Sequence, residues 1–211
     1  MMDKAKAIDD FLRRVDRFTQ LVLVTDEEVS LLFGEEVTAA MAKLDRFSQE
    51  EKVCWGCGGI CCRDVGCELY ASPFGQCPIH EFRPIVCRFH FCQRFDGAGK
   101  SLIVELRDIF LGCLTAVDFR DSASLRSLDI PPLAEFCPEL IAAVCPWVQA
   151  VRDGRLDPRQ GANLVLQEAA EYHNAYSTGA RGTDDHVYGA ISVGQRRIEI
   201  DIAQDGFGTE C

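Results

Sequence analysis

The chain has 211 residues, of which 47% are hydrophobic and 26% charged. This is the composition of a soluble globular protein with one domain, or one and a half, around a real core. With 22 Lys and Arg against 33 Asp and Glu, the formal net charge of −11 argues against nucleic acid as the main partner, because phosphate binding needs a basic face. No apolar run approaches the roughly 18 residues of a membrane span, and the N-terminal residues lack the apolar core of a signal peptide. We therefore expect a cytoplasmic protein without a membrane span.

Residues 1–53 are predicted to be helical and to cover the segment that follows. Thr25 and Glu28 have the spacing of a capping box, and Gly34 is expected to break or kink the helix that starts there. A second helical face is expected to run to about Glu51. Apolar residues recur at spacings of three and four along this region: Ile8, Phe11, Leu12, Val15, Phe18, Val22, then Val37, Met41, Leu44 and Phe47.

Residues 54–96 have a different character, because eight of the twelve cysteines fall here among glycines and prolines. Such residues break long periodicities and turn the backbone tightly. A reducing compartment keeps thiols reduced, so this cluster indicates metal binding rather than disulfides. A bound metal would then fix the conformation of a segment that has little regular secondary structure. The candidate ligands are Cys54, Cys57, Cys61, Cys62, Cys67, Cys77, Cys87 and Cys92.

Residues 97–176 are predicted to be helical and to pack on the cysteine segment. The expected helices are 101–117, where a short strand at 103–104 is the alternative, a stretch from Pro131-Pro132 across a kink at Pro146 to 151, and one from Asp157-Pro158 to about Tyr176. The tail 177–211 is polar, and a strand at 198–202 pairing with 190–193 across Gly194 would form a small β-hairpin. The predicted fold class is mainly α, a helical scaffold around a loop-rich cysteine segment.

The number of cysteines suits two four-cysteine sites, or one site with spare thiols. Cys54-x2-Cys57 has the spacing of a metal-binding knuckle, while Cys61 and Cys62 are chain neighbours that can serve two sites or two metals of one cluster. Spacing does not assign ligands to sites. The spacings of radical-type and bacterial ferredoxin motifs are absent. Cys54-x2-Cys57 has no βαβ pattern around it, as a thioredoxin motif would, and Gly58 stands where the c-type haem motif has a histidine.

Two pieces of the segment resemble the YkgJ-type cysteine-cluster family, described as a zinc- or iron-chelating domain with a C-x2-C-x2-C-C signature. They are Cys54-x2-Cys57 with Gly58 and Cys61-Cys62, and the later run from Cys77-Pro78 through Arg83-Pro84 to Cys87-Arg88-Phe89. The similarity covers roughly residues 54–95, with three residues instead of two between Cys57 and Cys61 and with His80 where the family has an aromatic residue. The resemblance implies metal chelation and no particular reaction.

Aromatic residues interleave with the cysteines, and a dry aromatic shell is typical of iron–sulfur clusters, although a small core under the loops is the equal alternative. His80 and His90 are minor candidates for ligands, and Arg83 and Arg88 either offset thiolate charge or lie on the surface. Cys113, Cys137 and Cys145 are expected to pack as small apolar side chains. The aromatic residues are Trp55, Tyr70, Phe74, Phe82, Phe89, Phe91 and Phe95.

We expect the segment to carry one or two iron–sulfur clusters for electron transfer or cluster handling, with a redox or accessory protein as partner. The alternative is a zinc-stapled interaction module without redox activity, and the second alternative is a metalloenzyme with an open coordination position. Asp64, Glu68 and Glu81 are available as acids or bases, but no pattern orients them. Enzyme activity is therefore left open.

Overall fold

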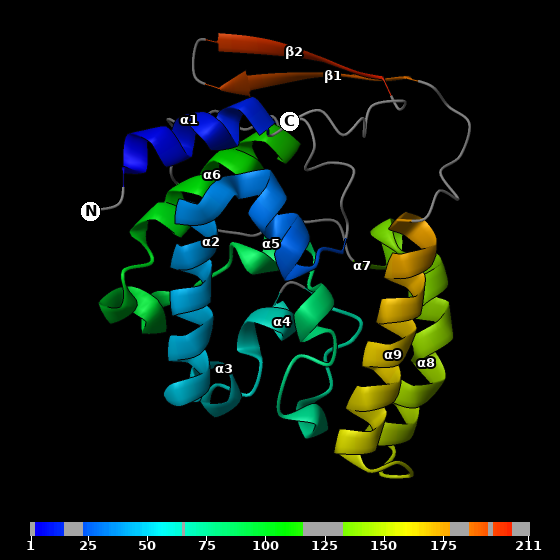
Figure 1. Ribbon diagram of the computed structural model, residues 1–211. Coiled ribbons are helices and arrows are strands. Elements are labelled where there is room, and N and C mark those ends of the chain that lie inside the picture. The colour runs from blue at the N-terminus through cyan, green and yellow to red at the C-terminus, as the bar shows by residue number, and fades with distance from the viewer. Residues whose placement is uncertain are drawn as a thin grey trace.

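The computed structural model describes residues 3–14, 23–64, 66–115, 133–177, 186–193 and 196–203, and these are mainly helical, which confirms the predicted fold class. Helix α2 lies on one side, the antiparallel pair α8 and α9 on the other, and short helices occupy the space between them (Figure 1). The helices are α1 (Lys4–Arg14), α2 (Asp26–Glu50), α3 (Val53–Gly56), α4 (Ile60–Asp64), η2 (Ser72–Phe74), η3 (His80–Phe82), α5 (Ile85–Arg88), η4 (Gln93–Ala98), α6 (Ser101–Thr115), α7 (Leu133–Phe136), α8 (Pro138–Arg152) and α9 (Pro158–Ser177).

Helix α2 begins with the predicted capping box. The Glu28 backbone N–H donates to Thr25 Oγ1 at 3.3 Å, and the Thr25 N–H donates to Glu28 Oε2 at 2.8 Å, so two helix-terminal donors are satisfied. Gly34 has φ +78° and ψ 174°, and the two parts of α2 meet there at a sharp bend (Figure 1). The predicted break at Gly34 is therefore confirmed, because a residue without Cβ can adopt this conformation at little cost.

A first hydrophobic core lies where α1, α2, α5, η4 and α6 meet. Its centre is a cluster of three phenylalanine rings, in which Phe33 and Phe89 meet edge to face at 5.0 Å and Phe11 lies 5.7 Å from Phe33. The predicted second face of α2 is buried here through Val37, Met41 and Leu44. The apolar periodicity of the N-terminal region therefore identified a true core face; its members Val15, Phe18 and Val22 lie outside the described residues.

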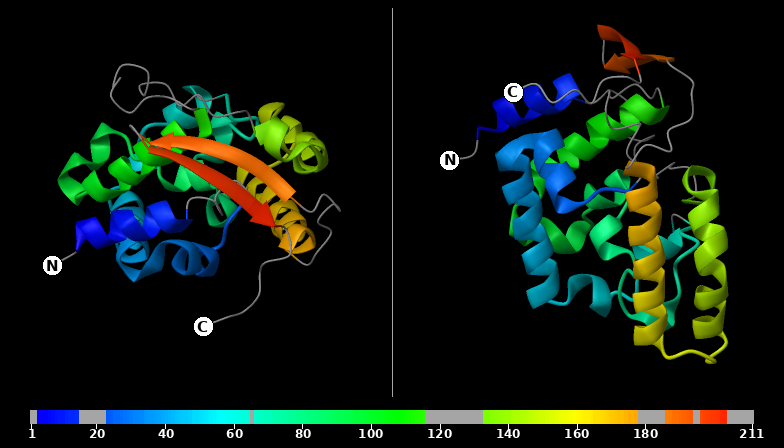
Figure 2. Two further views of the ribbon diagram at one scale, coloured as in Figure 1. Left: turned by 90° about the horizontal axis from the view of Figure 1, so that it is seen from above. Right: turned by 45° about the vertical axis from the view of Figure 1, so that its right-hand side comes forward.

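A second hydrophobic core lies between α8, α9 and the first half of the cysteine segment. Leu140, Val144, Val148 and Val151 form the buried face of α8, which continues through Pro146 as one helix. The α8–α9 pair forms one flank of the molecule (Figure 2). The two helices approach closely at Gly161, where an added Cβ would lie 2.2 Å from Val151 Cγ2.

Residues 54–96 form only short helical turns, as their glycines and prolines predict. The segment contributes to both cores in turn: Leu69, Ala71, Phe74 and Ile79 pack in the second core, and residues 85–98 then supply buried side chains to the first. The cysteine segment therefore connects the two cores, and neither core would be complete without it.

The later helices agree with the sequence in most details. Helix α6 starts at Ser101 and runs through residues 103 and 104, so the alternative of a strand there is wrong. Asp157 Oδ1 accepts from the backbone N–H groups of Arg159 and Gln160 at 3.0 and 3.2 Å, which confirms the cap of α9. The expected helix start at residues 131 and 132 lies outside the described residues.

Two C-terminal strands, β1 (His186–Val193) and β2 (Arg196–Ala203), pair antiparallel, with His186 opposite Ala203 and Val193 opposite Arg196. Their side chains, residues 194–195 and the rest of the predicted tail lie outside the described residues, so the small C-terminal β-hairpin stays a prediction. Among the described helices, none combines the length and the hydropathy that crossing a bilayer requires.

Candidate metal centre

All eight predicted ligands lie on the short turns between α2 and the α8–α9 pair. Cys54 is in α3, Cys61 and Cys62 are in α4, and Cys87 is in α5, whereas the other four are in the loops and caps that join these turns. Each of the eight is a free thiol, as are Cys137 and Cys145. The cysteines that the structure describes are therefore not cross-linked to one another.

The first knuckle follows directly from the end of α2. Lys52 adopts the left-handed conformation with φ +49° and turns the chain so that α3 starts at Val53. The Cys57 thiol donates to the Cys54 backbone oxygen at 3.2 Å, and Ser48 Oγ on α2 donates to Cys54 Sγ at 3.4 Å. The Cys54 thiol therefore lies next to the last turns of α2, and the Cys57 thiol lies against the Cys54 backbone.

A second turn forms around Cys67. Its backbone N–H donates to the Cys62 oxygen at 2.9 Å, and its own oxygen accepts from the Tyr70 N–H at 2.9 Å. Backbone N–H groups of Leu69 and Tyr70 also bond to the Cys67 thiol, and both counteract the effect of burial, which raises its pKa. Arg152 of α8 donates to the backbone oxygen of Tyr70 and so holds this turn against the second core.

Burial and mutual proximity keep most of these thiols protonated. Burial is the largest cause that raises the pKa of Cys61 to about 11, of Cys62 to about 12 and of Cys77 to about 11, and neighbouring thiols raise each of the three further. A protonated thiol is a poor nucleophile and a poor ligand. These three thiols are therefore poor nucleophiles, and a metal would bind them by displacing protons.

Cys87 is exposed to solvent although protein surrounds most of its thiol. The residue is exposed, yet burial is the largest cause that raises the pKa of its thiol, followed by the charges of Cys77, Cys67 and Cys62. Water touches the residue, but the protein around the thiol disfavours its ionisation. Cys87 is thus reachable by solvent while lying among other thiols.

Arg83 and Arg88 are held in ion pairs rather than on an open surface. Arg83 Nη2 lies 3.0 Å from Asp45 Oδ1, and its Nε donates to the His80 oxygen at 3.0 Å. Arg88, whose exposed fraction is only 4%, pairs with Asp26. The surface alternative is therefore wrong for both. Burial is the largest effect on the pKa of Cys77 and raises it, whereas the charge of Arg83 lowers it, so Arg83 can offset thiolate charge there.

The two histidines are half-buried and uncharged near neutral pH. Burial and Arg83 lower the pKa of His80 to about 4, and burial with Arg107 lowers that of His90 to about 4.

Several aromatic residues of the segment are core residues. Phe74, Phe89, Phe91 and Phe95 belong to the two cores, which is the alternative to a dedicated shell.

In the part of the chain that the structure describes, no group of three or more His, Cys, Asp or Glu side chains is arranged to hold a metal ion. The donor set nevertheless fits a thiophilic metal, because eight free thiols share one segment and many act on one another's pKa. A bound cation would displace the thiol protons and attract the resulting thiolates, which otherwise repel one another.

The cysteines outside the segment behave in two ways. Cys137 is fully buried in the second core, and burial raises its pKa to about 11, as expected for a small apolar side chain. Cys145 is exposed on α8, so the expectation that it packs in a core is wrong. The side chain of Cys113 and residue 211 lie outside the described residues.

Sequence analysis did not single out Asp45 and Ser48, which approach Arg83 and Cys54 from α2. Both lie in the last turns before the first cysteine, three residues apart, and this spacing puts them on one helix face. A search for polar residues on the helix that precedes the first knuckle would have found them. No family model matches the chain, and the comparisons with curated proteins and with solved structures found no match either.

Proposed function

We propose that this protein binds metal through the cysteines of residues 54–92, and that the metal is held as one or two iron–sulfur clusters that serve electron transfer or cluster handling. The observation that carries the proposal is the gathering of eight uncrosslinked thiols on one segment between two cores. A cluster held by cysteine thiolates supplies one-electron transfer when it is bound.

The protein environment supports thiolate ligation. Leu69 and Tyr70 direct backbone N–H groups at Cys67, and Ile79 directs one at Cys77. Such N–H···S bonds stabilise thiolates and tune the potentials of iron–sulfur centres. Arg83, held by Asp45, adds a fixed positive charge, which partly compensates the negative charge that several thiolates bring to a half-buried site.

A protein partner is part of the proposal. Trp55 is 66% exposed and Ile60 is 42% exposed, and both lie in the chain between or beside Cys54, Cys57 and Cys61. Exposed tryptophan is favoured at the centre of protein–protein contacts because it offers a large apolar surface with few degrees of freedom. A redox or accessory protein that docks over Trp55 would reach the first knuckle.

Anaerobic purification of the full chain tests this function. We expect a brown protein with broad visible absorption that bleaches on reduction, and matching amounts of iron and acid-labile sulfide. Cys87→Ser should lower the metal content, while Cys145→Ser, a substitution at an exposed thiol far from the segment in the chain, should leave it unchanged. A colourless protein with stoichiometric zinc would support the zinc-stapled module instead, and a folded protein that binds neither metal would overturn the proposal.

A further inference from the structure

The last turns of α2 form a fixed support beside the first knuckle. Leu44 is buried in the first core, and the Phe47 ring meets the Phe95 ring edge to face with centroids 5.9 Å apart. Asp45 and Ser48 come from the same turns and are half-buried. Side chains on a helix that is held by its core face keep a defined position, which side chains on a loop do not.

Ser48 reaches the sulfur of a predicted ligand directly. Its Oγ donates to Cys54 Sγ at 3.4 Å, within the range of a hydrogen bond to sulfur. The second thiol of the knuckle, Cys57, donates to the Cys54 backbone oxygen at 3.2 Å and leaves the Cys54 sulfur to Ser48. The hydroxyl of Ser48 therefore lies behind Cys54 as a donor that a bound thiolate would keep.

The chain returns to α2 through a conformation that a residue with a side chain rarely adopts. Lys52 has φ +49° and ψ 38°, which is unfavourable for a residue with a Cβ. This turn places α3, which carries Cys54, beside the C-terminal end of α2 (Figure 1). Backbone strain of this kind is often found at functional sites. Here it accompanies the contact between Cys54 and Ser48.

Asp45 holds a cation at the same end of α2. Arg83 Nη2 lies 3.0 Å from Asp45 Oδ1 and 3.3 Å from Oδ2, and Arg83 Nε donates to the His80 backbone oxygen at 3.0 Å. The side chains of Arg83 and Asp45 are only 15% and 19% exposed. Bonds to two different groups fix the plane of the guanidinium, so its charge has a defined position.

The spacing along α2 brings these two contacts together. Asp45 and Ser48 are three residues apart, so they share one helix face with Cβ atoms about 5–6 Å from each other. The Arg83 guanidinium and the Cys54 sulfur, each bonded to one of them, are therefore neighbours along this face. A hydroxyl donor and a fixed cation both stabilise the negative charge of a thiolate ligand.

We propose that Ser48 and Asp45 are positioning residues of the metal centre: Ser48 orients and polarises the Cys54 sulfur, and Asp45 holds the Arg83 guanidinium beside it. This assignment rests on the proposed function, that the segment binds metal. It extends the centre to a helix outside the cysteine segment. Hydrogen-bonding partners behind metal ligands typically change metal affinity about 10-fold to 100-fold.

Ser48→Thr and Ser48→Val test the role of the hydroxyl, because the two side chains have the same shape and only threonine keeps the donor. Co²⁺ is titrated into the reduced, metal-free full chain of each variant. Ser48→Thr should bind like the wild type, and Ser48→Val about 10-fold more weakly. Its sulfur-to-cobalt charge-transfer band should also move to lower energy, since the hydrogen bond no longer stabilises the sulfur electrons. Ser30→Val, at an exposed position of α2, should change neither quantity.

Equal affinity and equal band energy in Ser48→Thr and Ser48→Val would overturn the role of Ser48. Weaker binding without a band shift would also overturn it, because a purely structural effect gives that result. A wild type that takes up no Co²⁺ on its thiols would instead count against the proposed function. Circular dichroism checks folding, and Ser48→Ala repeats the test if Ser48→Val does not fold.

Asp45 is tested through Arg83. Asp45→Asn should weaken Co²⁺ binding about 10-fold in the wild type and have no further effect in an Arg83→Gln background, since Asp45 acts by holding that arginine. Asp153→Asn, which removes the acidic partner of Arg155 at the end of α8, should leave binding unchanged. Equal effects of Asp45→Asn in both backgrounds, or no effect in the wild type, would overturn this role.

Discussion

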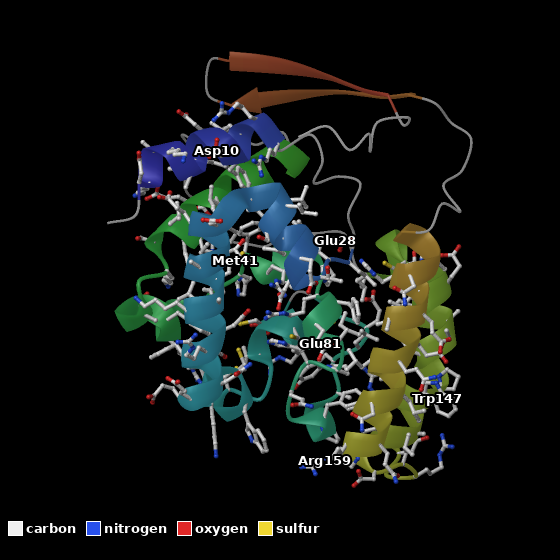
Figure 3. All side chains as sticks on the ribbon, viewed as in Figure 1. Asp10, Glu28, Met41, Glu81, Trp147 and Arg159 are labelled. Atoms are coloured by element: carbon white, nitrogen blue, oxygen red, sulfur yellow. The ribbon has the colours of Figure 1, made fainter. Side chains whose placement is uncertain are left out.

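Glu28 and His173, which are 145 positions apart in the chain, are joined by a hydrogen bond of 2.8 Å between Glu28 Oε2 and His173 Nε2. Glu28 lies at the N-terminal end of α2, on the side toward α9 (Figure 3). The same oxygen accepts from the Thr25 N–H, so the cap of α2 and the link to α9 share one atom. The Phe82 ring lies tilted against the His173 ring, with their centroids 5.2 Å apart. This contact therefore connects the helix of the first core with a helix of the second.

Removing the Glu28 carboxylate should destabilise the protein through both of its bonds. We expect Glu28→Ala to lower the free energy of unfolding by about 1–3 kcal/mol, because it leaves the nearly buried His173 ring and the Thr25 N–H without their acceptor. Glu28→Gln should cost less, since its amide oxygen can still accept. Urea denaturation measures both. A double-mutant cycle with His173→Ala that shows no coupling would contradict the link.

Gly161 should tolerate no side chain, since an added Cβ would lie 2.2 Å from Val151 Cγ2 in the second core. We expect Gly161→Ala to lower the free energy of unfolding by about 1–3 kcal/mol through overpacking of α8 against α9, in spite of the better helix propensity of alanine. Thermal or urea denaturation measures this change. Gly97→Ala is the matched control, because nothing lies within 4 Å of its added Cβ; equal stability of the two variants would contradict the close approach.

Gly59 should be required for the turn that leads into α4. It has φ +72°, and an added Cβ would lie 3.0 Å from Tyr70 Cε2. We expect Gly59→Ala to cost about 1–2 kcal/mol from the left-handed backbone alone and to lower metal content with it. Gly56→Ala, in α3, meets neither obstacle and is the control. Denaturation with parallel metal analysis tests the pair, and an unaffected Gly59→Ala protein would show that the turn does not depend on glycine.

Acid should destabilise the protein partly through His80. Burial and Arg83 lower its pKa to about 4 in the folded chain, whereas an unfolded histidine titrates near pH 6.5. Between these values only the unfolded state gains the proton. The contribution is therefore fully present above about pH 6.5 and is lost as pH falls toward 4.

His80→Gln should accordingly lose less stability on acidification than the wild type. The difference in slope between the two proteins is expected to reach at most about 1.4 kcal/mol per pH unit in this window. Urea denaturation at about pH 7 and about pH 5 measures the loss of unfolding free energy for each protein. Subtracting the value of the variant from that of the wild type removes the contributions of the carboxylates, which both proteins share. Parallel curves for the two proteins would mean that His80 keeps an ordinary pKa.

The amino-acid sequence by itself determined the features that depend on neighbours along the chain. The capping box at Thr25 and Glu28, the break at Gly34, the buried face of Val37, Met41 and Leu44, and the start of α6 all follow from local spacing. The turn-rich character of residues 54–96 follows from its glycines and prolines. Helix periodicity and backbone preference act over a few residues, so they can be read without the fold.

Only the tertiary structure decided which distant groups meet. Spacing left the eight cysteines undivided, whereas the fold packs Cys67 and Cys77 against the second core and Cys92 against the first. The partners of Arg83 and His173 likewise come from α2, and the exposure of Cys145 depends on which face of α8 packs inward. Such contacts depend on how the helices pack in three dimensions, and the spacing of residues in a single sequence does not predict which distant segments meet.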